Sequence, residues 1–319
     1  MGGLIGLVAE RFGLEAGAEV TLEANPGPGE RGDAAAWHGE GVSRMSFGAQ
    51  SLNSSELRRL GRRHRPADVA DAVADARGAG IASINLDLLY DIPGQSLDSW
   101  RTTLDAAIDL EPDHLSLYAL TLDDPDAEGI TGPLGDHLPT SRGARQWRGR
   151  AVAEQDQDRA AGMYEVAADR LDAGGWRGYE ISSWARPGHE SRHNLVYWER
   201  RPYEAVGPGA HAFDGRTRRW NAARLDGYIA ALTPASGVPP GLPPGGAEVI
   251  EPEAAASEAI ILGLRTDRGV PLDASRRPPL DRELDWALAV ELVALTNDDR
   301  IVLTTRGRIL SNELFARLV

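Results

Sequence analysis

The alternation of strand-like and helix-like segments over the first two thirds of the chain restricts its fold more than any other feature. Five segments have the apolar, β-branched character of strands, and they cover 18–26, 42–50, 83–90, 114–122 and 179–185. Helix-periodic runs lie between them, at 54–61, 66–79, 97–109 and 156–172. Strands that alternate with helices form parallel sheets joined by crossover helices, so the sequence predicts a TIM-like barrel or a doubly wound sheet.

The rest of the chain suggests an insertion, a linker and a second domain. Residues 123–155 are rich in Asp, Gly, Pro and Arg and lack periodicity, so we expect a surface insertion there. A Pro/Gly-rich stretch at 234–250 predicts a linker between a first domain, 1–233, and a second, 251–319. The second domain is mostly helical in pattern and ends in a short apolar strand, a turn at Gly307 and a helix. This order predicts a small winged-helix-like domain.

Composition excludes several classes of function. A net charge of −14 argues against a general nucleic-acid binder, because a phosphate backbone would repel such a surface. No apolar run is long enough to cross a bilayer, and the first residues are typical of an amphipathic helix rather than a signal peptide, so we expect a cytoplasmic protein without a transmembrane segment. The chain has no cysteine, so its own residues can form no disulfide, zinc–thiolate site or thiolate-bound iron–sulfur cluster.

Polar residues stand at or near the ends of the predicted strands, where parallel α/β barrels assemble their active sites. They are Glu23, Gln50, Asp87, Thr121 and, earlier in its strand, Glu180. Arg62 follows Gln50 and could bring a fixed positive charge to the same edge. Acid, amide and guanidinium groups together suit a zwitterionic ligand with ribose hydroxyls. A set of strand-end caps and buried salt bridges is the alternative, and spacing alone does not separate the two.

The segment SRHNLVYW, residues 191–198, is the second candidate site. His193 is the residue in it that is suited to bind a metal or haem iron, and Asn194 and Tyr197 could orient its ring. A single histidine is more often structural than a ligand, so this alternative stays open. His189 lies four residues before His193, but the Pro-Gly pair that precedes it argues against the helix that a zinc hydrolase motif requires.

Seven segments follow one another in a specific order: TLEANPG, GVSRMSFGAQSLNSSELRRLGRRH, NLDLLYDIPGQSLDSW, HLSLYALT, YEISSWARPG, HNLVYW and VGPGAHAF. Together they resemble the HemW family of radical S-adenosylmethionine (SAM) haem chaperones, which is closely related to oxygen-independent coproporphyrinogen III oxidase. The resemblance covers nearly the whole chain. It implies a radical-SAM-type (β/α) barrel, and it implies SAM, a 4Fe–4S cluster and haem as ligands of the family.

The resemblance also assigns roles to the candidate residues. It places the SAM pocket on Glu23, Gln50, Arg62, Asp87 and, as a weaker match, Thr121. The His-Asn-x-x-Tyr motif that the family associates with haem matches His193, Asn194 and Tyr197. The implied partners are haem and haem-accepting proteins.

The chain departs from the family pattern in its first part. Family members begin with a barrel strand, a Cys-x-x-x-Cys-x-x-Cys motif that binds the cluster and a Gly-Gly-Gly-Thr-Pro loop, and this chain has neither motif. We therefore expect a partial barrel without its first strands, with 18–26 at a bare sheet edge. We also expect an incomplete copy whose start lies too far downstream, and no radical chemistry by this chain's own residues.

Three functions stay open on the sequence, and whether the chain is an enzyme is undecided. The leading hypothesis is a HemW-like haem chaperone in which His193 helps to bind haem. The second is an oxygen-independent coproporphyrinogen III dehydrogenase, in which a 5′-deoxyadenosyl radical abstracts hydrogen from propionate side chains that then lose carbon dioxide. The third is a barrel hydrolase that uses Glu23, Asp87 or Glu180 as paired carboxylates, although nothing in the sequence defines their separation.

Overall fold

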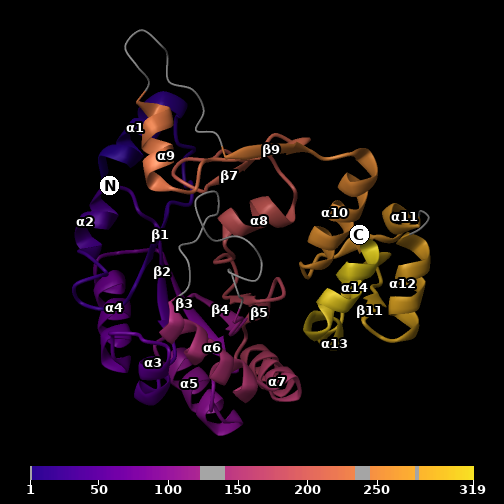
Figure 1. Cartoon of the computed structure of the whole chain (residues 1–319), viewed down its shortest axis with the longest axis horizontal. Coiled ribbons are helices and arrows are strands. Elements are labelled where there is room, and N and C mark those ends of the chain that lie inside the picture. The colour runs from indigo at the N-terminus through magenta and orange to yellow at the C-terminus, as the bar shows by residue number, and fades with distance from the viewer. Residues whose placement is uncertain (1, 123–140, 234–244, 277–279) are drawn as a thin grey trace. The chain divides into compact units, whose positions relative to one another are not determined.

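The protein is represented by a computed structural model that describes residues 2–122, 141–233, 245–276 and 280–319. Its residues cluster into two compact units (Figure 1). Unit 1 comprises Met1–Thr121 and Ala151–Arg192, and unit 2 comprises Leu122–Arg150 and His193–Val319. Apart from Leu122–Arg150, the units divide the chain near residue 192.

Unit 1 is built on a six-stranded sheet in the order β1-β2-β3-β4-β6-β5. Its strands are β1 (Thr21–Ala24), β2 (Arg44–Gln50), β3 (Ser83–Tyr90), β4 (His114–Ala119), β5 (Arg177–Gly178) and β6 (Ser183–Ala185). The strands β1 to β4 are parallel neighbours, as the alternation of strands and helices predicts. β1 lies at one edge of the sheet, as expected for 18–26.

The last two strands of this sheet correct one prediction. β6 is antiparallel to both β4 and β5, so the expectation of a further barrel-type parallel strand at 179–185 is wrong. Only residues 179–182 separate β5 from β6. A parallel connection needs a crossover of a dozen or more residues, so the chain can only turn back as a hairpin at this point.

One helix precedes the first strand of unit 1, and further helices lie in the connections between its strands. They are α1 (Gly2–Phe12), α2 (Ala34–Gly39), α3 (Ser54–Arg59), α4 (Pro66–Gly78), α5 (Leu97–Asp109) and α7 (Gln157–Ala173). The four helices predicted between the strands are confirmed, with ends that differ by two residues or fewer. The starts of α3, α5 and α7 are capped by Asn53, Ser96 and Asp156, whose side chains accept hydrogen bonds from N–H groups of the first turn.

The two faces of the parallel sheet differ in polarity, because side chains alternate along each strand. One face is apolar, and its buried side chains include Met45, Phe47, Ile84, Leu86 and Leu115. α4 packs against β2 and β3, and the helices of unit 1 lie outside the strands in Figure 1. The other face is polar yet also buried, and it includes Arg44, Ser46, Asn85, His114 and Ser116. A buried polar face requires an account of its hydrogen bonds.

Unit 2 contains two small antiparallel sheets. One joins β7 (His211–Phe213), β8 (Thr217–Trp220) and β9 (Gly246–Val249) in the order β7-β8-β9. The other joins β10 (Val270–Pro271), β11 (Val293–Leu295) and β12 (Arg300–Leu303) in the order β10-β12-β11. β9 lies within the segment 234–250 that was predicted to be a linker, and residues 234–244 of that segment lie outside the described part of the chain.

Helices complete unit 2 and correct two details. They are α8 (Arg192–Trp198), α9 (Leu225–Leu232), α10 (Pro252–Leu264), α11 (Leu272–Ser275), α12 (Leu280–Ala289), α13 (Thr305–Ile309) and α14 (Ser311–Leu318). The order of elements from α10 to β12 is that of a winged helix. Gly307 lies inside α13 rather than in a turn, because the Thr304 hydroxyl caps that helix by accepting from the Gly307 N–H at 2.9 Å. α6 (Arg142–Glu154) occupies the end of the predicted insertion, whose residues 123–140 are not among those described.

Within the described ranges, no helix has the length and apolar character needed to cross a membrane.

Candidate functional site

A hydrogen-bond network joins the polar side chains of β2, β3 and β4. Asn85 Nδ2 donates to Ser46 Oγ at 2.7 Å and to Asp87 Oδ1 at 2.8 Å. Ser46 Oγ donates to Asp87 Oδ2 at 3.0 Å, and Ser116 Oγ donates to Asn85 Oδ1 at 3.2 Å. The parallel register sets Ser46 opposite Asn85 and Asp87 opposite Ser116, which places all four side chains on one face. The Asp87 carboxylate accepts from two of these residues, Asn85 and Ser46.

Burial and hydrogen bonding act on the Asp87 carboxyl in opposite directions. Burial is the largest influence and raises its pKa above the ordinary value, and the nearby Glu23 carboxylate raises it further. The hydrogen bonds from its neighbours lower the pKa without cancelling the increase. Burial also raises the pKa of Tyr118 to about 12, and the charges of Asp87, Glu180 and Glu23 act in the same direction. Three carboxylates therefore influence the same phenol on the polar face.

Gln50 and Arg62 come together at the ends of β1 and β2. Gln50 ends β2 with φ of 64°, in the left-handed region that residues with side chains rarely occupy. Arg62 Nη1 donates to Asn25 Oδ1 at 3.2 Å. A Cβ on Gly48 would lie 2.8 Å from Gln50 Nε2 and 3.7 Å from Asn25 Oδ1, so the missing side chain leaves room for the Gln50 amide. Amide and guanidinium groups thus gather at one edge of the sheet.

Two of the predicted rim residues have other surroundings. Thr121 is exposed beyond the end of β4, and its hydroxyl donates to the Ala119 carbonyl at 3.5 Å. Glu180 is 2 % exposed and lies in the hairpin connection between β5 and the antiparallel β6, not in a parallel strand. Its charge nevertheless raises the pKa of Tyr118.

The second candidate site is carried by the helix α8. The hydroxyl of Tyr197 lies 3.0 Å from His193 Nε2 one turn earlier, and the two rings meet edge to face at 5.0 Å. Tyr197 meets Tyr203 in the same way at 4.6 Å, and Tyr203 lies 6.2 Å from Phe213 of β7. Burial, with a smaller influence from Tyr203, raises the pKa of Tyr197, so its hydroxyl stays protonated. We call His193, Tyr197, Tyr203 and Phe213 the aromatic row.

The remaining members of the motif region lie as follows. His193 is exposed on the first turn of α8, and Asn194 beside it is half-buried. His189 precedes α8, which begins at Arg192, so the two histidines do not share a helix. Among the residues that the structure describes, no group of three or more His, Asp or Glu side chains could hold a metal ion. A zinc hydrolase site of the kind considered for His189 and His193 therefore has no support.

A cavity of about 120 Å³ opens beside the aromatic row in unit 2. Its lining consists of Tyr197, Arg200, Tyr203, Phe213, Arg218, Glu258 and Leu262. Glu258 accepts from Arg200 Nε at 2.6 Å and also pairs with Arg218, and the Arg200 guanidinium lies 4.7 Å from the centre of the Phe213 ring. Pockets that enclose a small-molecule ligand have volumes of roughly 300–1,000 Å³. This cavity can therefore accept one edge of a large flat ligand but cannot enclose it.

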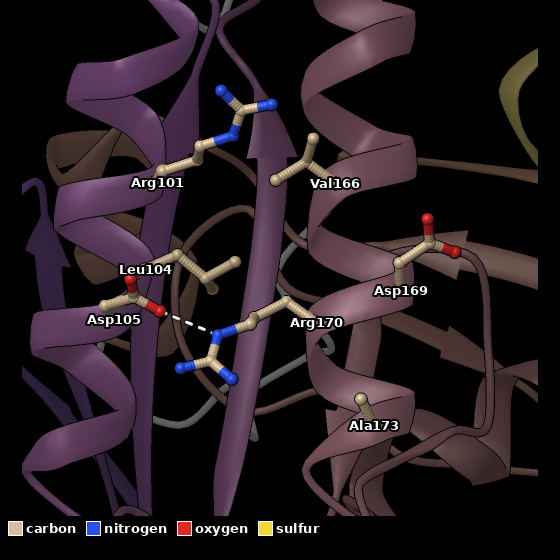
Figure 2. A pocket seen from close by; sticks show the side chains of 7 residues that line it. All are labelled: Arg101, Leu104, Asp105, Val166, Asp169, Arg170 and Ala173. Carbon is tan, nitrogen blue, oxygen red and sulfur yellow. Dashed lines mark hydrogen bonds and ion pairs between the residues drawn. The ribbon is translucent and has the colours of Figure 1, made fainter.

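A larger groove of about 350 Å³ lies between α5 and α7 in unit 1, as Figure 2 shows. The ion pair from Arg170 Nε to Asp105 Oδ1, at 2.7 Å, crosses it, and Leu104 also lines it. None of the residues predicted from the sequence lines this groove. We assign it no chemistry, because both ends of the ion pair are about half exposed and already neutralise each other.

Sequence reasoning missed Asn25, Ser46 and Asn85, although a signal was present. Asn85 lies two residues before Asp87, with a leucine between them, so both side chains point to one face of β3. Ser46 repeats that pattern on β2, between the apolar Met45 and Phe47. Looking for polar residues that alternate with apolar ones inside a strand, rather than only at its end, would have found this network.

Comparisons with known proteins agree with this architecture. The model of the Radical SAM superfamily matches residues 4–107. The haem chaperone HemW of Mycobacterium tuberculosis is 35% identical over 316 residues, which cover 99% of this chain and 75% of that protein. The haem chaperone HemW of Lactococcus lactis is 30% identical over 322 residues, which cover 99% of this chain and 79% of that protein.

A solved structure shows the same fold. The coproporphyrinogen III oxidase HemN of Escherichia coli, a radical SAM enzyme, superposes with a TM-score of 0.74 over 99% of this chain and 73% of that chain, at 19% identity. The parallel sheet and these matches define a protein of the radical SAM class. Within that class, the chain belongs to the HemW family, as its relatives of 30% identity or more over nearly the whole chain show.

Proposed function

We propose that this chain is a HemW-type haem chaperone, which binds haem through α8 and passes it to an acceptor protein. The observation that supports this most directly is the His193–Tyr197 pair on one face of a short helix, in the motif that the HemW family associates with haem. The relatives of nearly full coverage are haem chaperones, which supports the same conclusion. Haem is the cargo in this proposal, and a cytoplasmic location belongs to it as well.

His193 would supply the ligand to the haem iron. The Tyr197 hydroxyl lies 3.0 Å from His193 Nε2; in the tautomer that carries the imidazole proton on Nδ1, the hydroxyl donates to Nε2, which is then the basic nitrogen. Iron would take the place of this hydroxyl hydrogen at Nε2 when haem binds. Because the residue is exposed and the lost hydrogen bond contributes only about 1 kcal/mol, loading and release can both be easy.

The surroundings of His193 suit a flat apolar ligand. The aromatic row continues from His193 to Phe213 with ring centres 4.6 to 6.2 Å apart. Such rings bury a large apolar area and favour edge-to-face contacts. The cavity beside the row is too small to enclose a porphyrin, so most of the macrocycle would stay accessible to an acceptor protein. A haem carrier requires such an accessible ligand, whereas an enzyme that encloses its substrate does not leave it accessible.

We also propose that the polar edge of the sheet in unit 1 is a SAM pocket. The residues matched by resemblance are Glu23, Gln50, Arg62, Asp87 and Thr121. Carboxylates suit the ammonium and ribose hydroxyls of SAM, and an amide beside a guanidinium suits its carboxylate. The absence of a side chain at Gly48 leaves room for the Gln50 amide, which lies near Asn25 at this edge. When bound, SAM would supply a sulfonium-linked adenosyl group, and these residues would orient it.

The 4Fe–4S cluster of the radical SAM class does not fit the residues of this chain. Such clusters are held by cysteine thiolates, and the chain carries no cysteine. The described residues include no cluster of His, Asp and Glu that could replace them. This chain's own residues therefore offer no route to reductive cleavage of SAM.

The two enzymatic alternatives have less support. Coproporphyrinogen III dehydrogenase activity needs that cleavage, and the HemN superposition at 19% identity speaks only for the fold. A hydrolase with paired carboxylates needs a carboxylate free to act as acid or base. Asp87 instead accepts hydrogen bonds on both of its oxygens, from Asn85 and Ser46.

Haem titration followed at the Soret band tests the proposal. We expect His193→Ala to weaken haem binding at least tenfold and to change the Soret position, because the iron loses a nitrogen ligand. Tyr197→Phe should keep the Soret position and bind haem as tightly or slightly more tightly, since no hydroxyl then competes for Nε2. His38→Ala, an exposed histidine on α2, is the matched control and should behave as wild type. An unchanged spectrum in His193→Ala would exclude His193 as the ligand.

A further inference from the structure

The polar network of unit 1 continues through a fully buried histidine to the start of α8. His114 Nδ1 lies 2.6 Å from Asn85 Oδ1, and its Nε2 lies 2.8 Å from the Tyr179 hydroxyl. The Tyr179 oxygen accepts from the N–H of Ser191 at 3.2 Å, and Ser191 directly precedes α8. An unbroken series of hydrogen bonds therefore joins Asp87 to Ser191, the residue directly before α8. We call Asp87, Asn85, His114, Tyr179 and Ser191 the His114 path.

Each hydrogen bond of the His114 path has a defined direction. Asn85 uses its amide N–H to donate to Asp87, so its oxygen must accept from His114 Nδ1–H. An imidazole with its proton on Nδ1 accepts at Nε2, so Tyr179 donates there, and its oxygen accepts from Ser191. All donors along the path thus point toward the Asp87 carboxylate.

The path is shielded from water, so water cannot replace its hydrogen bonds. His114 is 0 % exposed, and Asn85, Tyr179 and Ser191 are at most 5 % exposed. Burial lowers the pKa of His114 well below its ordinary value, and burial raises the pKa of Tyr179, so both groups stay neutral. Loss of one of these hydrogen bonds leaves a buried donor or acceptor without that partner, so the neighbouring groups of the path must rearrange.

We propose that His114 and Tyr179 are positioning residues that couple Asp87, in the cofactor pocket, to the haem-binding helix α8. The inference rests on the proposed function, in which α8 carries the haem ligand and Asp87 belongs to the SAM pocket. A ligand that forms a hydrogen bond with Asp87 competes with Asn85 for the carboxylate. Because every link points the same way, the change reaches the N–H of Ser191, where α8 begins.

A second attachment keeps α8 folded when the His114 path is broken. The Arg192 N–H donates to Glu19 Oε2 at 2.9 Å, and Arg192 Nη1 donates to the Gly17 carbonyl at 2.7 Å. These contacts share no residue with the path. Loss of the path should therefore loosen the start of α8 without unfolding unit 1, which makes the inference testable with single substitutions.

Amide hydrogen exchange of the full chain without haem is the first test. Tyr179→Phe removes one hydroxyl from the path, and we expect at least tenfold faster exchange in residues 191–194. Asp87→Asn, at the far end of the path, should accelerate exchange in the same residues at least threefold. The matched control is Tyr164→Phe, because Tyr164 is also buried and donates its hydroxyl, at 2.7 Å, to the Ile181 carbonyl outside the path. It should leave residues 191–194 as in wild type.

The alternative is that the His114 path only stabilises the core of unit 1. In that case Tyr179→Phe and Tyr164→Phe would accelerate exchange equally and throughout unit 1, and Asp87→Asn would not affect residues 191–194. Either result would overturn the inference. The readout does not involve haem, so it is independent of whether the proposed function is correct.

A double-mutant cycle on haem affinity is the second test. Asp87 and Tyr179 share no direct hydrogen bond in the structure, so independent roles predict that their effects on the dissociation constant multiply. Coupling through the path predicts that the double variant, Asp87→Asn with Tyr179→Phe, changes the dissociation constant by a factor at least threefold smaller than the product of the two single effects. If wild type binds no haem, the proposed function fails while the exchange result still decides the path. If haem binds and the effects multiply, the coupling fails and the chaperone function stands.

Discussion

Acid should destabilise unit 1 through one buried histidine. His114 is 0 % exposed, and both of its ring nitrogens are engaged in hydrogen bonds that require the neutral ring. Burial lowers its pKa well below the ordinary value of 6.5, and Arg44 and His189 act in the same direction. The unfolded chain therefore binds a proton near pH 6.5 that the folded chain excludes. This contribution to stability is complete above pH 6.5 and is lost as the pH falls below that value.

The size of the loss follows from the linkage between protonation and folding. Each pH unit well below 6.5 removes about 1.4 kcal/mol from the free energy of unfolding. Between pH 8 and pH 5 the His114 contribution falls by about 2 kcal/mol, because the unfolded histidine takes up its proton in that range while the buried ring stays neutral. Asp87 acts in the opposite direction, because its pKa is raised in the folded state and its protonation on acidification favours folding. The His114 effect must therefore be isolated by comparing variants.

His114→Gln is the suitable variant, because an amide offers a donor and an acceptor but does not bind a proton in this range. We expect it to be less stable than wild type at pH 8, but to lose about 2 kcal/mol less on going to pH 5. Urea unfolding followed by tryptophan fluorescence measures both values. His38→Gln, at an exposed position, should reproduce the wild-type dependence on pH. Equal losses in His114→Gln and wild type would refute the assignment of a buried neutral histidine.

Two matched pairs test packing elsewhere, with thermal unfolding as the measurement. Glu258→Gln removes the carboxylate that Arg200 and Arg218 share beside the aromatic row, and it should lower the free energy of unfolding by about 1–3 kcal/mol. Glu248→Gln, at a half-exposed position, is the control and should change that free energy by less than about 1 kcal/mol. Equal effects would contradict the shared pairing. Gly307→Ala would place a Cβ against the Leu292 carbonyl and should lower the free energy of unfolding by about 1–3 kcal/mol. Gly162→Ala, in open space on α7, is the control and should leave that free energy unchanged or raise it by up to about 1 kcal/mol. A Gly307→Ala variant as stable as wild type would contradict the packing of α13.

Periodicity was enough to predict the parallel part of the sheet because each signal is local. The helices α3, α5 and α7 begin at capping residues that any reader of the sequence can see. The direction of β6 was not predictable in the same way. Its composition is that of a strand whichever way it runs, and only the shortness of the connection from β5 decides the matter.

The candidate site in unit 1 was predictable at the strand ends but not within the strands. Gln50 and Asp87 stand at or near strand ends, where parallel barrels place functional groups, so position made them candidates although it did not separate a ligand site from strand-end caps. The partners of Asp87 depend on strand register, since a shift of one residue would turn Ser46 to the opposite face. Register is a property of the assembled sheet, and a single strand sequence does not contain it.

In the α8 site, the sequence supplies the motif residues, but contacts with the rest of the fold determine their geometry. The spacing of His193 and Tyr197 is that of one helical turn, so the motif becomes a hydrogen-bonded pair only if the segment is helical. Seven residues are too few for a stable helix in water, where about 12–15 are needed. Tertiary contacts must therefore hold α8, and its start is bound by Glu19, 173 residues before Arg192, and by Tyr179, 12 residues before Ser191. Because α8 depends on these hydrogen bonds, a change in them can shift the helix. The His114 path therefore has a physical means of changing the position of His193.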